Sequence, residues 1–212
     1  MNVQWVKTPR WIKRIFSNLI WEGPKKEKVI YLTFDDGPTP EITEWVIEHL
    51  ERYDFKATFF LIGDNIRKYP EIAQLVLKNG HAIGNHTFNH WNGWRYSTKA
   101  YIENTSRCAE EIETQLDKQS LLFRPPYGKI KPSQVWQLRK KGYKIIMWDI
   151  ITYDWDASKS PEFCYATIVK NVTPGSIIVF HDSKKAFGNL KVVLPKALKY
   201  LHENGFRSER LI

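Results

Sequence analysis

Two adjacent carboxylates, Asp35 and Asp36, directly follow the apolar run 29–34. Burying two unpaired charges is costly, so a cation is expected beside them. His86 and His90 stand four residues apart, a spacing that places two imidazoles on one face of a helix. One aspartate and both histidines would provide three ligands for a divalent metal ion and leave a position open for water, as catalytic metal sites do. Zn²⁺ is the natural first choice, and Co²⁺, Ni²⁺ or Mn²⁺ also accept such ligands.

The second aspartate and three residues further along the chain could carry out acid–base chemistry. A carboxylate beside a bound water can take its proton, because a metal ion lowers the pKa of that water. Arg124 could hold this carboxylate through a bidentate contact. His181 could protonate a leaving group, and Asp182 or another carboxylate could raise the pKa of this histidine. Together these groups indicate metal-assisted hydrolysis of an acyl bond, with backbone N–H groups stabilising the oxyanion.

A covalent mechanism is disfavoured by what the sequence lacks. It contains no Gly-x-Ser-x-Gly segment, and neither Cys108 nor Cys164 has a sequence context typical of a nucleophile. Two cysteines do not indicate a disulfide scaffold, although one bridge between them stays an open alternative.

The elements that must position these side chains alternate along the chain. This alternation predicts a parallel sheet with helices outside, closed or nearly closed into a barrel, with an open doubly wound sheet as the alternative. We predict strands over 29–34, 57–62, 81–84, 121–123, 144–149 and 176–180, and helices over 40–53 (with Thr39 as N-cap), 70–79, 99–118, 132–141, 161–171 and 189–204.

Unusual polar residues follow five of the predicted strands, at their carboxyl ends. The two aspartates follow the first strand and the histidine pair follows the third, while Arg124, Asp154 and His181 follow or end later ones. Carboxyl ends of parallel strands share one face of such folds, and active sites are built on that face. We therefore expect all of these residues in one site.

Composition and charge favour a single globular domain without a nucleic-acid partner. The chain has 212 residues, of which 42% are hydrophobic, and a net charge of +9. The basic residues are scattered over turns and helix ends, and no nucleic-acid-binding motif accompanies them. We expect a monomer that binds no nucleic acid.

Residues 1–28 are predicted to form an N-terminal extension ahead of the domain at residues 29–212. Apolar residues between 11 and 20 recur at helical spacing with basic residues between them. We expect this amphipathic face to pack on the domain, with attachment to a membrane surface as the alternative. Residues 1–21 lack the continuous apolar core of a signal peptide, so a cytoplasmic location is the default expectation.

The chain resembles the polysaccharide deacetylases of carbohydrate esterase family 4, which share the NodB homology domain. The resemblance covers roughly residues 29–206 and rests on five ordered motifs. The first two are Thr-Phe-Asp-Asp-Gly at 33–37 and His-Thr-Phe-Asn-His at 86–90. They imply Asp35 as catalytic base and Asp36, His86 and His90 as metal ligands.

Three later motifs complete the resemblance. Arg-Pro-Pro-Tyr-Gly at 124–128 is similar to the motif in which the arginine orients the base and the backbone N–H of the tyrosine, here Tyr127, helps form the oxyanion hole. Asp154 and Trp155 resemble the family pair in which the aspartate supports this arginine and the tryptophan forms part of the wall of the site. The last motif, Leu-x-His in the family, reads Val-Phe-His at 179–181. It implies His181 as general acid, with Val179 in place of the leucine that lines an acetate-methyl pocket.

The resemblance also implies a fold and an activity. The fold would be a distorted (β/α) barrel of about seven units, with parallel strands inside and helices outside. The activity would be metal-dependent removal of acetyl groups from N-acetylated, and in some members O-acetylated, glycans such as chitin oligomers or peptidoglycan sugars. Trp91, Trp94, Tyr127 and Trp155 are candidate sugar platforms. A catalytically weak or inactive glycan-binding protein on the same fold is the alternative, and family precedent favours an extracytoplasmic location.

Overall fold

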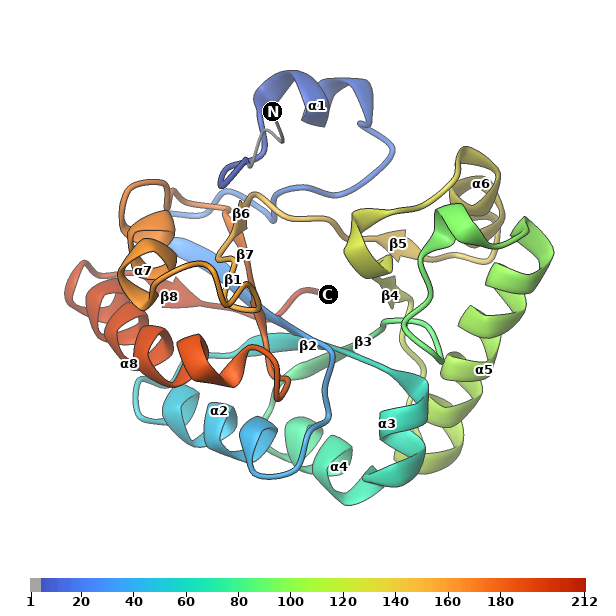
Figure 1. Ribbon diagram of the computed structural model, residues 1–212, viewed down its shortest axis with the longest axis horizontal. Coiled ribbons are helices and arrows are strands. Elements are labelled where there is room, and N and C mark those ends of the chain that lie inside the picture. The colour runs from blue at the N-terminus through green and yellow to red at the C-terminus, as the bar shows by residue number, and fades with distance from the viewer. Residues whose placement is uncertain (1–4) are drawn as a thin grey trace.

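The structure, a computed structural model, is organised around β1 (Val29–Asp35), which is buried along its whole length (Figure 1). It describes residues 5–212; residues 1–4 of the predicted extension lie outside the described part. The strands are parallel, in the order β5-β4-β3-β2-β1-β7-β6, and β8 pairs with β1. The other strands are β2 (Ala57–Leu61), β3 (Ala82–Asn85), β4 (Leu122–Phe123), β5 (Lys144–Ile145), β6 (Ile150–Ile151), β7 (Ile177–His181) and β8 (Arg207–Ser208).

Helices surround the curled sheet, which confirms the predicted distorted (β/α) barrel (Figure 1). Parallel neighbours require a crossover connection, and helices provide most of these crossovers. The α-helices are α1 (Arg10–Ile15), α2 (Ile42–Glu51), α3 (Gly63–Lys68), α4 (Pro70–Lys78), α5 (Thr98–Leu116), α6 (Pro132–Lys140), α7 (Pro161–Val169) and α8 (Phe187–Glu203), and two 3₁₀ helices are η1 (Gly93–Arg95) and η2 (Pro126–Gly128).

Three local predictions were wrong. The helix α2 begins two residues later than expected, and Glu41 rather than Thr39 is its N-cap. Only the first two residues of the predicted strand 144–149 form a strand, β5, because the chain then crosses to the other end of the sheet, where β6 begins at Ile150. The helix α3 was not predicted, since six mostly polar residues carry little helical periodicity.

Side chains of β1 alternate between two apolar layers, as the pleat of a strand requires. Ile30, Leu32 and Phe34 belong to the large cluster beneath the helices, which also contains the free cysteines Cys108 and Cys164. The opposite face of β1 belongs to the smaller cluster inside the barrel, formed by Val29, Tyr31, Phe60, Leu122, Ile146, Ile177 and Leu211. The polar residues Thr33 and Asp35 continue this inner face toward the carboxyl end of the strand.

The N-terminal extension crosses the seam between β5 and β6, the two ends of the sheet. The Ile20 N–H donates to the Ile145 carbonyl at 2.9 Å, and the Met147 N–H donates to the Ile20 carbonyl at 2.7 Å. On the other side of the seam, the Thr8 N–H donates to the Asp149 carbonyl at 2.8 Å. The extension therefore satisfies backbone groups that an open seam would leave unpaired.

The apolar face predicted between residues 11 and 20 packs on the domain in part. Leu19 and Ile20 contact apolar clusters of the domain, whereas Trp11, Ile15 and Phe16 are exposed. No residue of α1 is buried, whereas Leu19, beyond its end, is. The extension is held by backbone pairing on both sides of α1, so the helix itself projects from the body (Figure 1). Within residues 5–212, no helix combines the length and apolar character needed to cross a membrane.

A buried carboxylate, Asp149, attaches the extension to the seam. Its side chain is fully buried, forms an ion pair with Lys13, lies 3.4 Å from the Lys7 Nζ, and accepts a hydrogen bond from Ser176 Oγ at 2.6 Å. The backbone carbonyl of the same residue accepts from Thr8. One residue thus links the extension to the sheet through charge and through the backbone.

We expect Asp149→Asn to destabilise the protein by about 3 kcal/mol, because it removes the fully buried charge with which both Lys13 and Lys7 pair. Urea unfolding should show a lower midpoint with an unchanged slope. The matched control is Glu48→Gln, which removes an exposed carboxylate paired with Arg52 and should change the midpoint little. Equal midpoints for Asp149→Asn and the unchanged protein would contradict this role.

Candidate active site

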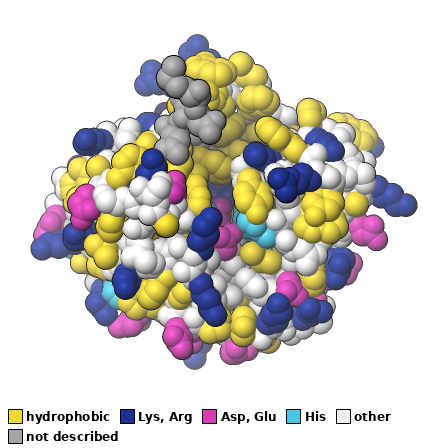
Figure 2. All heavy atoms as spheres, viewed as in Figure 1, with side chains coloured by type: hydrophobic (Ala, Val, Ile, Leu, Met, Phe, Trp, Pro, Cys, Tyr) yellow, Lys and Arg dark blue, Asp and Glu magenta, His cyan; other side chains and the backbone are white. Residues whose placement is uncertain are grey.

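A cavity of about 570 Å³ opens at the carboxyl ends of the strands. Figure 2 shows histidine and acidic side chains together near the middle of the same face. Most of the predicted site residues line the cavity: Asp35, Asp36, His86, His90, Tyr127, Trp155, Val179 and His181. Arg124 and Asp154 do not line it but lie directly behind two of these residues, and both are buried.

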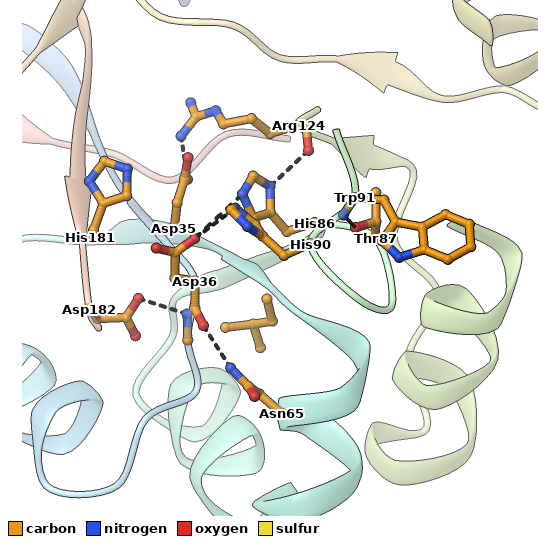
Figure 3. A network of polar contacts seen from close by, with 12 residues as sticks. Asp35, Asp36, Asn65, His86, Thr87, His90, Trp91, Arg124, His181 and Asp182 are labelled. Atoms are coloured by element: carbon orange, nitrogen blue, oxygen red, sulfur yellow. Dashed lines mark hydrogen bonds and ion pairs between the residues drawn. The ribbon is translucent and has the colours of Figure 1, made fainter. Parts of the chain in front are cut away.

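The three predicted metal ligands converge on one point. Asp36 Oδ1 lies 3.2 Å from His90 Nε2 and 3.7 Å from His86 Nε2, and the three ligand atoms all lie within 4.8 Å of one another (Figure 3). Asp36 Oδ1 is buried but has no hydrogen-bond partner among residues 5–212. His86 Nδ1 is 2.8 Å from the Arg124 carbonyl, an arrangement that leaves Nε2 as a lone-pair donor. An orphaned carboxylate oxygen facing two imidazole nitrogens fits a divalent metal ion.

Electrostatics around the triad also suit a cation. Burial lowers the pKa of His86 to about 4, so its imidazole is neutral, as a metal ligand must be. Burial acts to raise the pKa of Asp36, but nearby histidines, led by His90, outweigh that effect and hold it well below its usual range. Asp36 is therefore an anion.

The histidine pair does not lie on a helix, which corrects the reasoning from its spacing. His86 immediately follows β3, and the loop 86–90 includes two left-handed residues, Thr87 with φ 65° and His90 with φ 55°. The Asn104 side chain on α5 accepts hydrogen bonds from the Phe88 N–H at 3.0 Å and from the Asn89 N–H at 3.2 Å. A tightly held loop, rather than helical periodicity, brings the two imidazoles together.

The second aspartate of the pair faces a different cation. Arg124 Nη1 donates to Asp35 Oδ1 at 2.7 Å, and Figure 3 shows Asp35 and Asp36 pointing in different directions. The contact is not bidentate as predicted, because Nη1 also donates to Thr33 Oγ1 at 2.8 Å and Nη2 donates to the Met147 carbonyl at 3.0 Å. Burial lowers the pKa of Arg124, and Asp35 acts in the opposite direction. The guanidinium thus sets the orientation of the Asp35 carboxylate.

The carboxylate that contacts His181 is Asp154, and not Asp182. Asp154 Oδ1 lies 2.8 Å from His181 Nδ1, and Oδ2 accepts from the His181 backbone N–H at 2.8 Å. Burial acts to lower the pKa of His181, but the charge and hydrogen bond of Asp154 raise it to about 9. No contact joins Asp154 to Arg124 within the described residues, so the arginine-buttressing role implied by the resemblance is not seen.

Asp182 lies beside the turn that follows Asp36. Its carboxylate accepts from the Gly37 N–H at 3.1 Å and from Thr43 Oγ1 at 2.5 Å, and burial raises its pKa to about 7. A Cβ at Gly37 would lie 2.1 Å from Asp182 Oδ2, so only glycine fits this turn. Asp182 therefore holds the turn that follows Asp36.

Aromatic and apolar side chains form much of the cavity wall. The Trp155 ring lies 4.6 Å from the His181 ring, and the Tyr127 ring lies 4.7 Å from the His90 ring. Val179 is buried and lines the same cavity.

Two predicted sugar platforms lie outside the cavity, and one aromatic residue was missed. Trp91 stacks on Tyr96 with ring centroids 3.8 Å apart, and Trp94 does not line the cavity either. Trp148 does line it. It stands near the end of the predicted strand 144–149, so the carboxyl-end rule that located the other residues could have found it. Lys185 and Asn65 also line the cavity and carried no motif signal.

Comparison with known proteins gives consistent relatives. The family model for "Polysaccharide deacetylase" matches residues 22–146. A peptidoglycan-N-acetylglucosamine deacetylase of Bacillus cereus is 36% identical over 189 residues, covering 88% of this chain and 88% of the relative. A chitooligosaccharide deacetylase of Azorhizobium caulinodans is 36% identical over 170 residues, covering 74% of this chain and 75% of the relative.

The fold agrees with a solved structure from the same group. The crystal structure of the Bc1960 peptidoglycan N-acetylglucosamine deacetylase superposes with a TM-score of 0.86 at 29% identity, covering 96% of this chain and 95% of that chain. The ordered motifs, the barrel and the family match lead to one conclusion. The chain belongs to the polysaccharide deacetylase family, carbohydrate esterase family 4.

Proposed function

We propose that this protein is a metal-dependent hydrolase that removes acetyl groups from N-acetylated glycans. One observation carries the proposal: two independently held acid–base groups flank the three-ligand set. Asp35, held by Arg124, and His181, held by Asp154, occupy paired positions on the neighbouring strands β1 and β7. A base and an acid on one cavity wall are what amide hydrolysis requires.

Asp36, His86 and His90 would hold one divalent metal ion, for which Zn²⁺ is the first choice. When bound, the metal would supply Lewis-acid polarisation of the acyl oxygen and lower the pKa of water. Asp35, which is not one of the three metal ligands, would take a proton from the attacking water. Arg124 holds the Asp35 carboxylate in the orientation that this step needs. The water oxygen then bonds to the acyl carbon.

His181 would complete the reaction on the leaving-group side. Its Nδ1 is held by Asp154, which leaves Nε2 to give a proton to the sugar nitrogen as the C–N bond breaks. The products are acetate and a free amine. In line with the family resemblance, we propose that the backbone N–H of Tyr127 donates a hydrogen bond that stabilises the oxyanion.

The substrate assignment rests on the relatives and on the cavity wall. The relatives named above act, by their names, on peptidoglycan N-acetylglucosamine and on chitooligosaccharides. The rings of Trp155, Tyr127 and Trp148 line the cavity and offer apolar faces to a sugar ring. Val179, in place of the family's leucine, leaves more room for the acyl methyl, a change worth about 1–3 kcal/mol in acyl preference. We therefore infer an N-acetylhexosamine glycan as substrate.

We expect Asp35→Asn to lower kcat by about 10²–10⁴-fold while metal binding is retained, because the variant loses the base but keeps all three ligands. Metal-loaded protein is incubated with N-acetylated chitooligosaccharides, peptidoglycan fragments and O-acetylated glycans, and acetate release is measured. Asp117→Asn, a change at an exposed residue at the end of α5, is the matched control and should keep full activity.

Two outcomes would contradict these assignments. Activity that survives in Asp35→Asn would show that another group is the base. Acetate release from none of the glycans, together with measurable glycan binding, would instead identify an inactive glycan-binding protein on this fold.

We expect His90→Gln to weaken metal binding by more than about 100-fold, since one of three protein ligands is lost. Titration calorimetry of chelator-treated protein with Zn²⁺, Co²⁺, Ni²⁺ and Mn²⁺ measures this directly and also ranks the metals. His202→Gln, at an exposed histidine on α8, serves as control and should bind metal like the unchanged protein. Equal affinities for both variants would place the metal elsewhere.

The pH dependence should report the pair of His181 and Asp154. With a pKa of about 9, His181 is protonated and able to donate below that pH, so kcat/KM should fall as the pH rises through about 9. Asp154→Asn removes the anion that raises this pKa, so the falling limb should move to lower pH by at least about one unit. Asp156→Asn, in the same loop, is the control. An unmoved limb in Asp154→Asn would exclude His181 as the titrating acid.

A further inference from the structure

Four large apolar side chains of the N-terminal extension are exposed together on and beside α1. The exposed fractions are 40% for Trp5, 55% for Trp11, 63% for Ile15 and 48% for Phe16, and we call this group the apolar knob. The α1 helix projects from the edge of the molecule in Figure 1, and hydrophobic side chains gather at the same edge in Figure 2. A contiguous exposed apolar group of this kind marks an interaction surface.

The charged side chains of the first 21 residues of the extension are all basic. Residues 1–21 contain no aspartate or glutamate and four basic residues. Lys7 and Lys13 are paired with buried or partly buried carboxylates, but Arg10 and Arg14 form no ion pair within residues 5–212. Arg10 and Arg14 are exposed and flank Trp11 in sequence. The apolar knob is therefore bordered by two free positive charges.

The knob has a fixed position on the domain. Backbone hydrogen bonds hold the extension on both sides of α1, through Thr8 and Ile20. The Tyr153 hydroxyl donates to the Trp5 carbonyl at 3.4 Å, and the Tyr153 ring lies 5.1 Å from the Trp155 ring, which lines the active-site cavity. Whatever binds the knob is thereby held beside the rim of the cavity.

We propose that the apolar knob docks onto an anionic membrane surface. Tryptophan and phenylalanine beside arginine form the composition that inserts at the boundary between headgroups and acyl chains, with the charges directed to anionic lipids. A second copy of the chain fits less well, because a symmetric contact through the same surface would bring Arg10 and Arg14 of both copies together. A glycan also fits less well, since Trp5 and Trp11 meet edge to face at 84° and form no continuous flat platform.

Docking of this kind is independent of the deacetylase proposal, since no residue of the knob lines the cavity. It would be reversible, because four side chains and two charges provide far less attachment than a spanning helix. Its effect would be to concentrate the enzyme, with its cavity rim, at a lipid surface.

The experiment is co-sedimentation of the full chain with vesicles. We expect binding to vesicles of about one part phosphatidylglycerol to two parts phosphatidylcholine, weaker binding at high salt, and little binding to phosphatidylcholine alone. Trp11→Ser with Ile15→Ser should lower the partition coefficient by at least about tenfold. Arg10→Gln with Arg14→Gln should lower it by about fivefold for each arginine.

Matched controls come from α6, which carries an exposed tryptophan beside a lysine. Trp136 is 60% exposed, and the Lys140 Nζ lies 4.5 Å from its ring. Trp136→Ser and the pair Arg139→Gln with Lys140→Gln should bind the vesicles like the unchanged protein. All variants should keep the thermal unfolding midpoint, because the altered side chains are exposed.

Three results would overturn the proposal. The first is absence of binding to the anionic vesicles. The second is equal loss of binding in the α6 controls and the knob variants, which would indicate unspecific attraction. The third is concentration-dependent self-association that Trp11→Ser with Ile15→Ser abolishes while vesicle binding is absent, which would assign the knob to a second copy of the chain.

Discussion

A guanidinium buried inside the barrel is the interaction on which the rest of the site depends. Arg124 is fully buried, so each of its nitrogens must find an acceptor to offset the loss of water. It finds them on β1, through Thr33 and Asp35, and on the segment after β5, through the backbone carbonyls of Ile146 and Met147. One cation thereby joins separate strands and orients the carboxylate that faces the cavity. The contacts of Arg124 therefore stabilise the fold and orient the site at the same time.

Each buried carboxylate also needs a partner that offsets its loss of water, and this need explains how neighbouring acidic residues acquire different roles. Asp35 is matched by an arginine, Asp36 by two imidazoles arranged for a metal ion, and Asp154 by His181. Asp182, which forms no ion pair within residues 5–212, accepts hydrogen bonds from a backbone N–H and a hydroxyl, and burial raises its pKa. Each carboxylate takes its chemical character from the group that offsets its burial.

Much of the fold followed from local patterns. Alternating apolar runs and capped helices indicated a parallel barrel, because each run must bury its apolar face against its neighbours. The rule that carboxyl ends of parallel strands share a face predicted one shared site, and the aspartates Asp35 and Asp36, the histidine pair and His181 line one cavity, with Arg124 directly behind it. The predicted bounds of a strand were wrong where contacts between residues far apart in the sequence decide them. The predicted strand 144–149 ends as β5 at Ile145, and the next residue, Ile146, pairs with Ile20, more than a hundred residues earlier in the chain.

The sequence by itself determined which acidic and histidine side chains gather at the site, since residue type limits which groups can ligate a metal or hold a proton. Only the tertiary structure decided which carboxylate meets which cation. His181 is paired with Asp154 rather than with its neighbour Asp182, and the two histidines predicted to bind a metal meet through a loop and not along a helix. Such choices depend on side-chain direction and on the desolvation of each charge, and these exist only once distant strands are assembled.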